Sequence, residues 1–116
     1  MTPEAFNDFR KRMNERILGA DSTVFKKVYN VDASAYRAGH LDEKTKELMG
    51  LTASMVLRCD DCVRYHIGQS LAVGATPAQI IEAFEIALVV GGTIVIPHLR
   101  RAMEYLDACT EAQNPS

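Results

Sequence analysis

Apolar residues recur at spacings of three and four along most of the chain, which is the period of amphipathic α-helices. Near the N-terminus this series begins at Phe6 and includes Phe9, Met13 and Ile17. The only β-like run is Ile94–Ile96, which is too short to indicate a strand. The pattern therefore predicts an all-α fold.

Capping and helix-breaking residues divide the chain into about six helices. The clearest start is Thr76-Pro77-Ala78-Gln79, which combines an N-cap, a proline in the first turn and a capping-box glutamine. We expect the last residues, Glu111–Ser116, to form a frayed tail. The first predicted helix starts at Pro3 and ends before Gly19, and the second starts at Asp21 or Ser22 and includes Val28. A short predicted helical turn follows Asp32 and ends at Gly39. The remaining predicted helices run from Asp42 to about Leu57, from Cys59 to Gly74 and from Thr76 to Gly91, and Thr93 caps the last one.

Length and composition indicate one compact domain over residues 1–116. A chain of 116 residues falls within the usual size of a single domain, and neither repeats nor a low-complexity linker divides it. With 47% hydrophobic and 24% charged residues, the composition excludes a disordered or collagen-like chain.

Charge and hydropathy give no sign of a nucleic-acid or membrane partner. The net charge is −2 and no basic run stands out, so we expect no nucleic-acid binding. The longest apolar run, Ile86–Ile96, is shorter than the ~20 residues of a membrane-spanning helix. The segment Met1–Glu4 lacks the basic-then-apolar order of a signal peptide. We therefore expect a cytoplasmic protein.

The sequence contains three cysteines, two of which form a Cys-x-x-Cys at Cys59 and Cys62. Three is an odd number and too few for the disulfide framework of a secreted protein. In a reducing compartment this spacing indicates redox chemistry or a metal site. Cys109 has no partner at motif spacing, and we expect it to be an inert, partly buried thiol.

A helix that begins near Cys59 places Cys62 and His66, which are four residues apart, on one face. Thiols at a helix N-terminus lie at the positive end of the helix dipole, which favours the thiolate. His66 can accept the Cys62 proton, and a carboxylate can orient that histidine. Glu47, on the preceding predicted helix, is the candidate carboxylate.

Other interpretations of these residues stay open at this point. Cys59, Cys62 and His66 could be ligands in a small zinc-binding or oligomerising module, although no second pair at zinc-finger spacing supplies the fourth ligand. His66 could be a hydrogen-bonded core histidine. Glu47 could be a solvated helix residue. We expect His98, near the start of the last predicted helix, to be structural rather than catalytic.

The whole string Glu47-x11-Cys59-Asp60-Asp61-Cys62-x3-His66 resembles the active-site motif of the carboxymuconolactone decarboxylase/alkylhydroperoxidase D-like superfamily. The resemblance covers roughly residues 35–105. At Asp61 the sequence departs from the hydroperoxidase members, which carry a histidine there. Further matching segments are Leu41–Lys46, Gly74–Pro77 and Gly91–Gly92.

The resemblance implies a thiol-disulfide oxidoreductase that reduces hydroperoxides without a tightly bound cofactor. Cys62 would be the attacking thiol, His66 its proton acceptor, and Glu47 the carboxylate that completes the relay. Peroxide would oxidise Cys62 to a sulfenic acid, and Cys59 would condense with it to a disulfide. A dithiol reductant, which in such family members is a lipoyl group, would reopen that disulfide.

Two further expectations follow from the resemblance. The γ-carboxymuconolactone decarboxylase branch is a lyase alternative, but that branch does not depend on a cysteine pair, so the Cys59/Cys62 pair favours the oxidoreductase. Members of this kind assemble as trimers or hexamers through apolar helical faces. The dense apolar stretch Ile86–Ile96 is typical of such an interface, so we expect a homotrimer or homohexamer.

Overall fold

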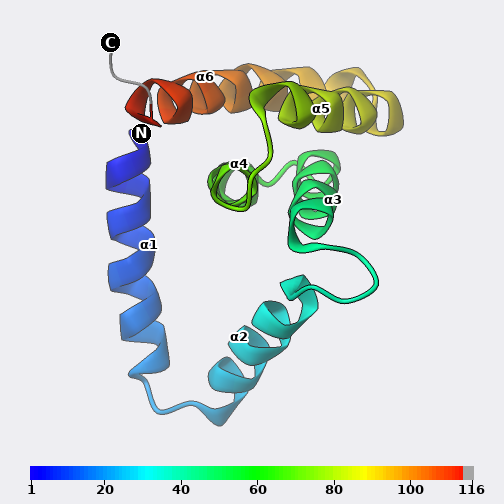
Figure 1. The fold of residues 1–116 in the computed structure, drawn as a ribbon. Coiled ribbons are helices and arrows are strands. Elements are labelled where there is room, and N and C mark those ends of the chain that lie inside the picture. The colour runs from blue at the N-terminus through cyan, green and yellow to red at the C-terminus, as the bar shows by residue number, and fades with distance from the viewer. Residues whose placement is uncertain (114–116) are drawn as a thin grey trace.

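The computed structural model, which describes residues 1–113, contains six α-helices and one 3₁₀ turn and, within those residues, no strand. This confirms the predicted all-α fold (Figure 1). The elements are α1 (Pro3–Leu18), α2 (Thr23–Tyr36), α3 (Glu43–Val56), α4 (Asp60–Ala72), α5 (Pro77–Gly91), η1 (Thr93–Val95) and α6 (Ile96–Gln113).

Local capping determines most of the helix boundaries. Asp42 accepts a hydrogen bond of 2.7 Å from the backbone N–H of Thr45 and starts α3. Thr76 and Gln79 form the predicted capping box at the start of α5. Gly74 follows α4 and has a φ of 97°, a left-handed conformation that a residue with a Cβ adopts only with strain.

The second helix is longer than predicted. The sequence suggested a separate short turn after Asp32 that ends at Gly39, but α2 is continuous to Tyr36. No glycine or proline interrupts residues 23–36, so nothing ends the helix before Arg37 adopts an extended conformation. This extension makes Tyr36 the last helical residue of α2.

Two predictions about the last helix were wrong. Thr93 lies inside η1, whose N-cap position is occupied by Gly92, and α6 begins only at Ile96. The predicted frayed tail begins too early, because α6 continues to Gln113. The rest of that predicted tail, residues 114–116, lies outside the described residues.

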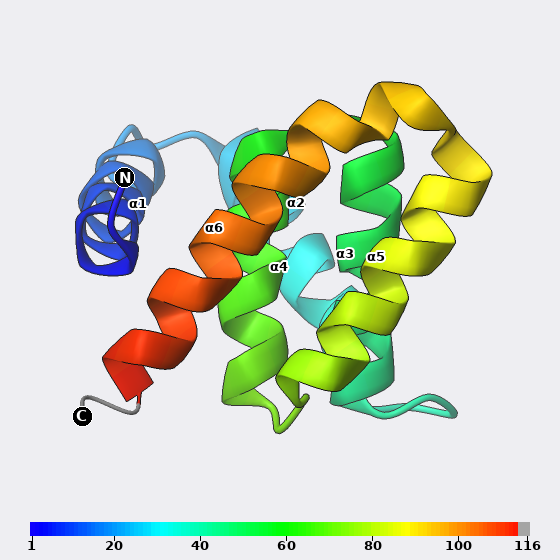
Figure 2. The same cartoon turned by 90° about the horizontal axis from the view of Figure 1, so that it is seen from above.

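The core lies between two layers of helices. In Figure 1, α5 and α6 form a layer over the sides of α3 and α4, and Figure 2 shows α5 and α6 diverging from the turn that joins them. Helix α3 packs mainly against α4 and α5, and α4 packs against α6. From α1 only Phe6 is fully buried, and its ring meets that of Tyr105 edge-on at 5.8 Å. The central pair α3 and α4 is therefore held rigidly, and both helices carry residues of the predicted site.

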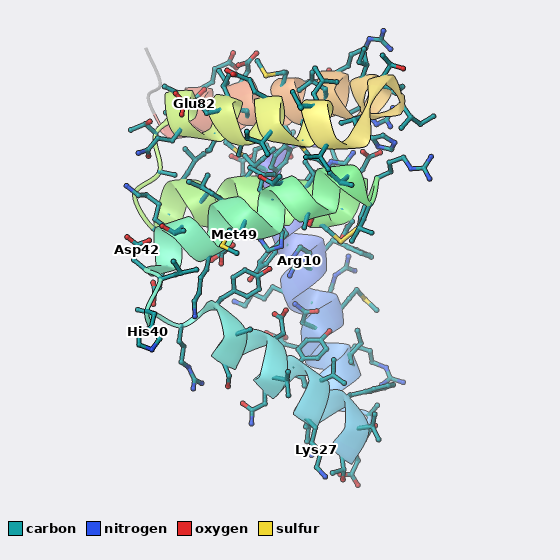
Figure 3. All side chains as sticks on the ribbon, turned by 90° about the vertical axis from the view of Figure 1, so that its right-hand side faces the viewer. Arg10, Lys27, His40, Asp42, Met49 and Glu82 are labelled. Atoms are coloured by element: carbon teal, nitrogen blue, oxygen red, sulfur yellow. A yellow bond between two sulfur atoms is a disulfide. The ribbon has the colours of Figure 1, made fainter. Side chains whose placement is uncertain are left out.

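Helix α2 contributes no buried residue to this core. It projects away from the layered helices (Figure 3). Its link to α1 includes a hydrogen bond of 2.9 Å from the Tyr29 hydroxyl to Asn14 Oδ1. An apolar stripe on α2 is consequently exposed; its members are Val24, Phe25, Val28 and Val31.

Candidate active site

The cysteine pair lies at the N-terminus of α4. Cys59 is the N-cap residue and is joined to Cys62 by a disulfide. The Cys59 Sγ also accepts a hydrogen bond of 3.2 Å from the backbone N–H of Cys62. Arg58 directs the chain into this cap with a φ of 61°, which is unusual for a residue other than glycine. Both sulfurs thus lie where the unpaired N–H groups and the helix dipole stabilise negative charge.

A buried acid–base pair joins α3 to α4 next to the cysteines. Glu47 is 5% exposed and His66 is 7% exposed, and Glu47 Oε2 lies 2.8 Å from His66 Nδ1. Because a carboxylate can only accept, Nδ1 carries the hydrogen in this bond. Glu47 is therefore not a solvated helix residue. Its neighbour Lys46 turns outward and donates a hydrogen bond of 2.7 Å to the carbonyl oxygen of Arg37.

Tyr36, at the end of α2, is the second partner of His66. Its hydroxyl lies 3.2 Å from His66 Nε2, and the two ring centroids are 5.3 Å apart. Burial and then the negative charge of Glu47 raise the pKa of Tyr36, so the hydroxyl keeps its proton at neutral pH. Sequence reasoning missed this residue, because a lone tyrosine in a separate helix carries no spacing signal that links it to the motif.

Aromatic groups enclose the other side of the histidine. The Tyr65 ring centroid lies 5.1 Å from that of His66. The guanidinium of Arg10, from α1, lies 4.0 Å from the Tyr65 ring centroid, a cation–π contact. A pocket of about 220 Å³ opens beside Tyr36, Glu47 and Tyr65. Small molecules or water can therefore approach the Glu47–His66 pair from this side.

The structure brings the four predicted site residues together as two adjacent pairs. Cys59 is bonded to Cys62, and Glu47 is bonded to His66. His66 follows Cys62 by one turn of α4. In the disulfide form neither sulfur has a proton to give, and both ring nitrogens of His66 are engaged by Glu47 and Tyr36. The arrangement supplies a dithiol and a buried general base on neighbouring turns.

A third group of polar side chains lies at the same end of α4. Asp60, the residue after Cys59, accepts hydrogen bonds of 2.7 Å from His98 Nδ1 and 2.8 Å from Arg101 Nε. Burial raises the pKa of Asp60, but the hydrogen bonds from His98 and Arg101 and the positive charge of Arg101 lower it by more, so it lies below the ordinary aspartate value. These contacts hold the cysteine-bearing end of α4 against α6. The contact made by His98 is therefore structural, as we expected from the sequence.

The remaining cysteine is separate from this site. Cys109 is a buried free thiol on α6. Burial raises its pKa more than the hydrogen bond with Tyr105 lowers it. A buried thiol with a raised pKa has little thiolate at neutral pH and reacts slowly.

Residues 1–113 show features that bear on the membrane and zinc interpretations. No helix there combines the length and the apolar character needed to cross a bilayer. Within the same residues, no three His, Cys, Asp or Glu side chains converge in an arrangement suited to a metal ion. The two thiols proposed as zinc ligands are instead bonded to each other.

Comparison with known families decides the relationship of the chain. Residues 23–105 match the sequence profile of the Carboxymuconolactone decarboxylase family. The chain belongs to this family. The membership confirms the resemblance inferred from the sequence, and it is consistent with the all-helical fold.

Solved structures of other carboxymuconolactone decarboxylase family proteins share the architecture. One crystal structure of TM1620 from Thermotoga maritima is 50% identical to this chain and superposes with a TM-score of 0.93. The alignment covers 97% of this chain and 99% of the TM1620 chain. A second TM1620 structure, also 50% identical, covers 94% and 92% with a TM-score of 0.89. It is described as a family protein with a suggested involvement in the antioxidative response. The family protein lpg0406 from Legionella pneumophila is 29% identical, covers 93% and 87%, and has a TM-score of 0.61.

Curated sequence relatives are more distant and have no assigned function. An uncharacterized protein of Cupriavidus necator is 33% identical over 75 residues, which is 65% of this chain and 66% of that protein. Uncharacterized protein 4 of the cox locus of Paracoccus denitrificans is 32% identical over 69 residues, which is 60% of this chain and 62% of that protein. The chain thus spans less than two thirds of the length of either relative.

Proposed function

We propose that this carboxymuconolactone decarboxylase family member is a thiol-disulfide oxidoreductase that reduces hydroperoxides. The observation that supports it best is the Cys59–Cys62 disulfide at the start of α4, one helical turn from the buried Glu47–His66 pair. A helix N-terminus favours the thiolate, and a histidine oriented by a carboxylate is a suitable acceptor for the thiol proton. The suggested antioxidative involvement of TM1620 points in the same direction.

The proposed cycle begins with the dithiol form. His66 accepts the Cys62 proton, and the Cys62 thiolate attacks the terminal oxygen of a hydroperoxide, ROOH. The O–O bond breaks, Cys62 becomes a sulfenic acid, and the leaving alkoxide takes the proton from His66 to give ROH. The Cys59 thiol then attacks the Cys62 sulfur, which forms the disulfide and releases water.

An external dithiol closes the cycle. One of its thiolates attacks the Cys59–Cys62 disulfide, and its second thiol resolves the mixed disulfide. The products are the Cys59 and Cys62 thiols and the oxidised donor, so two electrons pass from donor to peroxide. We propose a lipoyl group as this donor, with no tightly bound cofactor in the protein. A reducing compartment such as the cytoplasm, which we propose as the location, supplies dithiols of this kind.

The test is peroxide-dependent turnover with a dihydrolipoyl donor, measured for the wild type and for Cys62→Ser. The wild type should consume peroxide and donor in equal amounts, and Cys62→Ser should lose this activity. Cys109→Ser is the matched control and should keep it, because that thiol lies outside the site. Absence of turnover in the wild type, or its survival in Cys62→Ser, would contradict the proposal. Decarboxylation of a carboxymuconolactone by Cys62→Ser would instead indicate the lyase branch.

We also propose that the protein works as a homo-oligomer, a trimer or hexamer. An apolar groove of about 910 Å³ runs between α3 and α5 and includes Met49 and Glu82 in its lining; both are labelled in Figure 3. Val89, which precedes the groove residue Val90 in the sequence, is 82% exposed. The stripe on α2 is also exposed. Apolar surface of this extent is typical of an interface between copies of a chain.

A further inference from the structure

We propose, building on the dithiol function above, that Tyr36 is a positioning residue of the Glu47–His66 pair. Its hydroxyl holds Nε2 of His66 and so sets how readily that ring accepts the Cys62 proton. No motif spacing assigns a role to Tyr36, which comes from α2, outside the two helices that carry the cysteines and the acid–base pair.

The hydrogen bonds of His66 define what Tyr36 can do. Because Nδ1 donates to Glu47, the neutral ring has its lone pair on Nε2, which accepts from the Tyr36 O–H. When the ring is protonated, Nε2–H can donate to the Tyr36 oxygen instead. A hydroxyl can both donate and accept a hydrogen bond, so Nε2 has a partner before and after proton transfer. Any proton that leaves Cys62 for this ring arrives at Nε2, at or beside the Tyr36 hydroxyl.

A glycine on α3 provides the space for this contact. A Cβ at Gly50 would lie 2.5 Å from the Tyr36 hydroxyl oxygen and 2.8 Å from His66 Cε1. Gly50 lies inside a helix and its φ is not positive, so the backbone itself does not require glycine there. Glycine in a helix interior is unfavourable relative to alanine. The close approach of Tyr36 to His66 explains why glycine occupies position 50.

The charged groups around the tyrosine keep its hydroxyl protonated. Glu47 on α3 and Asp32 on α2 are the anionic neighbours, and both raise the pKa of Tyr36 after the larger effect of burial. Tyr65 on α4 is also close, and Arg10 on α1 lies over the Tyr65 ring. At neutral pH the group facing Nε2 is therefore a hydroxyl, which can both donate and accept.

The test compares two substitutions with two matched controls. Tyr36→Phe removes the hydroxyl and keeps the ring, while Tyr29→Phe removes the other hydrogen-bonded hydroxyl of α2, which bonds Asn14. Gly50→Ala adds a Cβ that would crowd both the Tyr36 hydroxyl and the His66 ring, and so disturbs their contact from the α3 side. Gly68→Ala makes the same change on α4, where a Cβ would meet nothing within 4 Å.

Two readouts follow Cys62 and His66 in the reduced protein. One is the rate of Cys62 alkylation as a function of pH, located by peptide mass spectrometry. The other is the ¹⁵N chemical shifts of the His66 ring, which report the tautomer. Tyr36→Phe and Gly50→Ala should slow alkylation at neutral pH about fivefold, because the hydrogen bond of the protonated ring to the tyrosine oxygen is stronger than the one that the neutral ring accepts. Both should also shift the ring signals. Gly68→Ala should change neither readout, and Tyr29→Phe, which removes a bond of α2 without touching His66, should change both far less than Tyr36→Phe does.

Unchanged alkylation and ring signals in a folded Tyr36→Phe variant would overturn the proposal. If Gly50→Ala does not fold, Tyr36→Phe still decides the question, because phenylalanine fits the space of the tyrosine ring. Neither readout needs peroxide or donor. A wild type without peroxide turnover would therefore contradict the proposed function, while the effect of Tyr36 on Cys62 would still be decided.

Discussion

Replacing Glu47 with glutamine isolates the contribution of one negative charge. The glutamine carbonyl can still accept the hydrogen bond from His66 Nδ1, so the ring keeps its position and loses only the carboxylate charge. Hydrogen bonds to charged groups contribute about 1.5–3 kcal/mol and neutral ones about 0.5–1.5 kcal/mol. Because Glu47 and His66 are both buried, solvent screens their interaction little. We expect a loss of about 1–2 kcal/mol, or about 5- to 30-fold in the rate of Cys62 deprotonation.

The assay is alkylation of the reduced protein at a series of pH values, with peroxide turnover measured in parallel. Glu47→Gln and His66→Gln should each slow both reactions and move the midpoint of alkylation to higher pH. The double variant should lose little beyond the slower single variant, because linked residues act as one unit. Glu85→Gln, at an exposed position on α5 outside the groove, is the control for removing a carboxylate elsewhere.

Two results would refute this reasoning. Losses that multiply in the double variant would show that Glu47 and His66 act independently. An unchanged alkylation profile in Glu47→Gln, with the fold intact by thermal melting, would show that the carboxylate does not assist Cys62.

Four further predictions concern thiols, charge, packing and assembly. Mild peroxide should remove two titratable thiols, leave Cys109, and be reversed by dithiothreitol; irreversible over-oxidation alone would contradict this. Asp60→Asn should lower the free energy of unfolding by about 1 kcal/mol at pH 7. Because the pKa of Asp60 is lowered in the folded state, this stabilisation is complete above the ordinary aspartate pKa and is lost as pH falls, so the difference in urea unfolding should narrow below about pH 4. Ser70→Ala should leave stability unchanged or raise it by about 1–2 kcal/mol, since the buried Ser70 hydroxyl has no hydrogen-bond partner among residues 1–113; a lower melting temperature would contradict this. Light scattering should give the mass of a trimer or hexamer, which Val28→Glu on the exposed stripe should reduce; a monomeric wild type would refute the assembly.

Local signals in the sequence were sufficient to predict most of the fold. The start of α5 depends on Thr76 and Gln79, which are three residues apart and act through their own backbone. The end of α4 depends on the conformation of Gly74. The error at α2 also comes from reliance on local signals. A helix continues where no residue stops it, and a helix end is harder to predict where no glycine or proline marks it.

The candidate site was predictable only as far as its motif. Glu47 and His66 are 19 positions apart. The order of the helices made Glu47 a candidate partner of His66, and the resemblance to a family supported that pairing, but neither specified the contact. The contacts of His66 with Tyr36 and of Asp60 with His98 span 30 and 38 positions. Such contacts depend on how whole helices pack, and no spacing rule within one helix encodes them.

The sparse packing of α2 has a consequence for the kinetics of the site. A helix without buried side chains opens at a low free-energy cost, well below that of global unfolding. Tyr36 is its last residue, so each fraying event at that end leaves His66 Nε2 without its partner. Hydrogen exchange in α2 and the reactivity of the reduced dithiol should then respond together to mild warming or dilute urea, while the amides of α3 stay protected. The reaction centre would be tied to the local unfolding equilibrium of a peripheral helix rather than to the stability of the core.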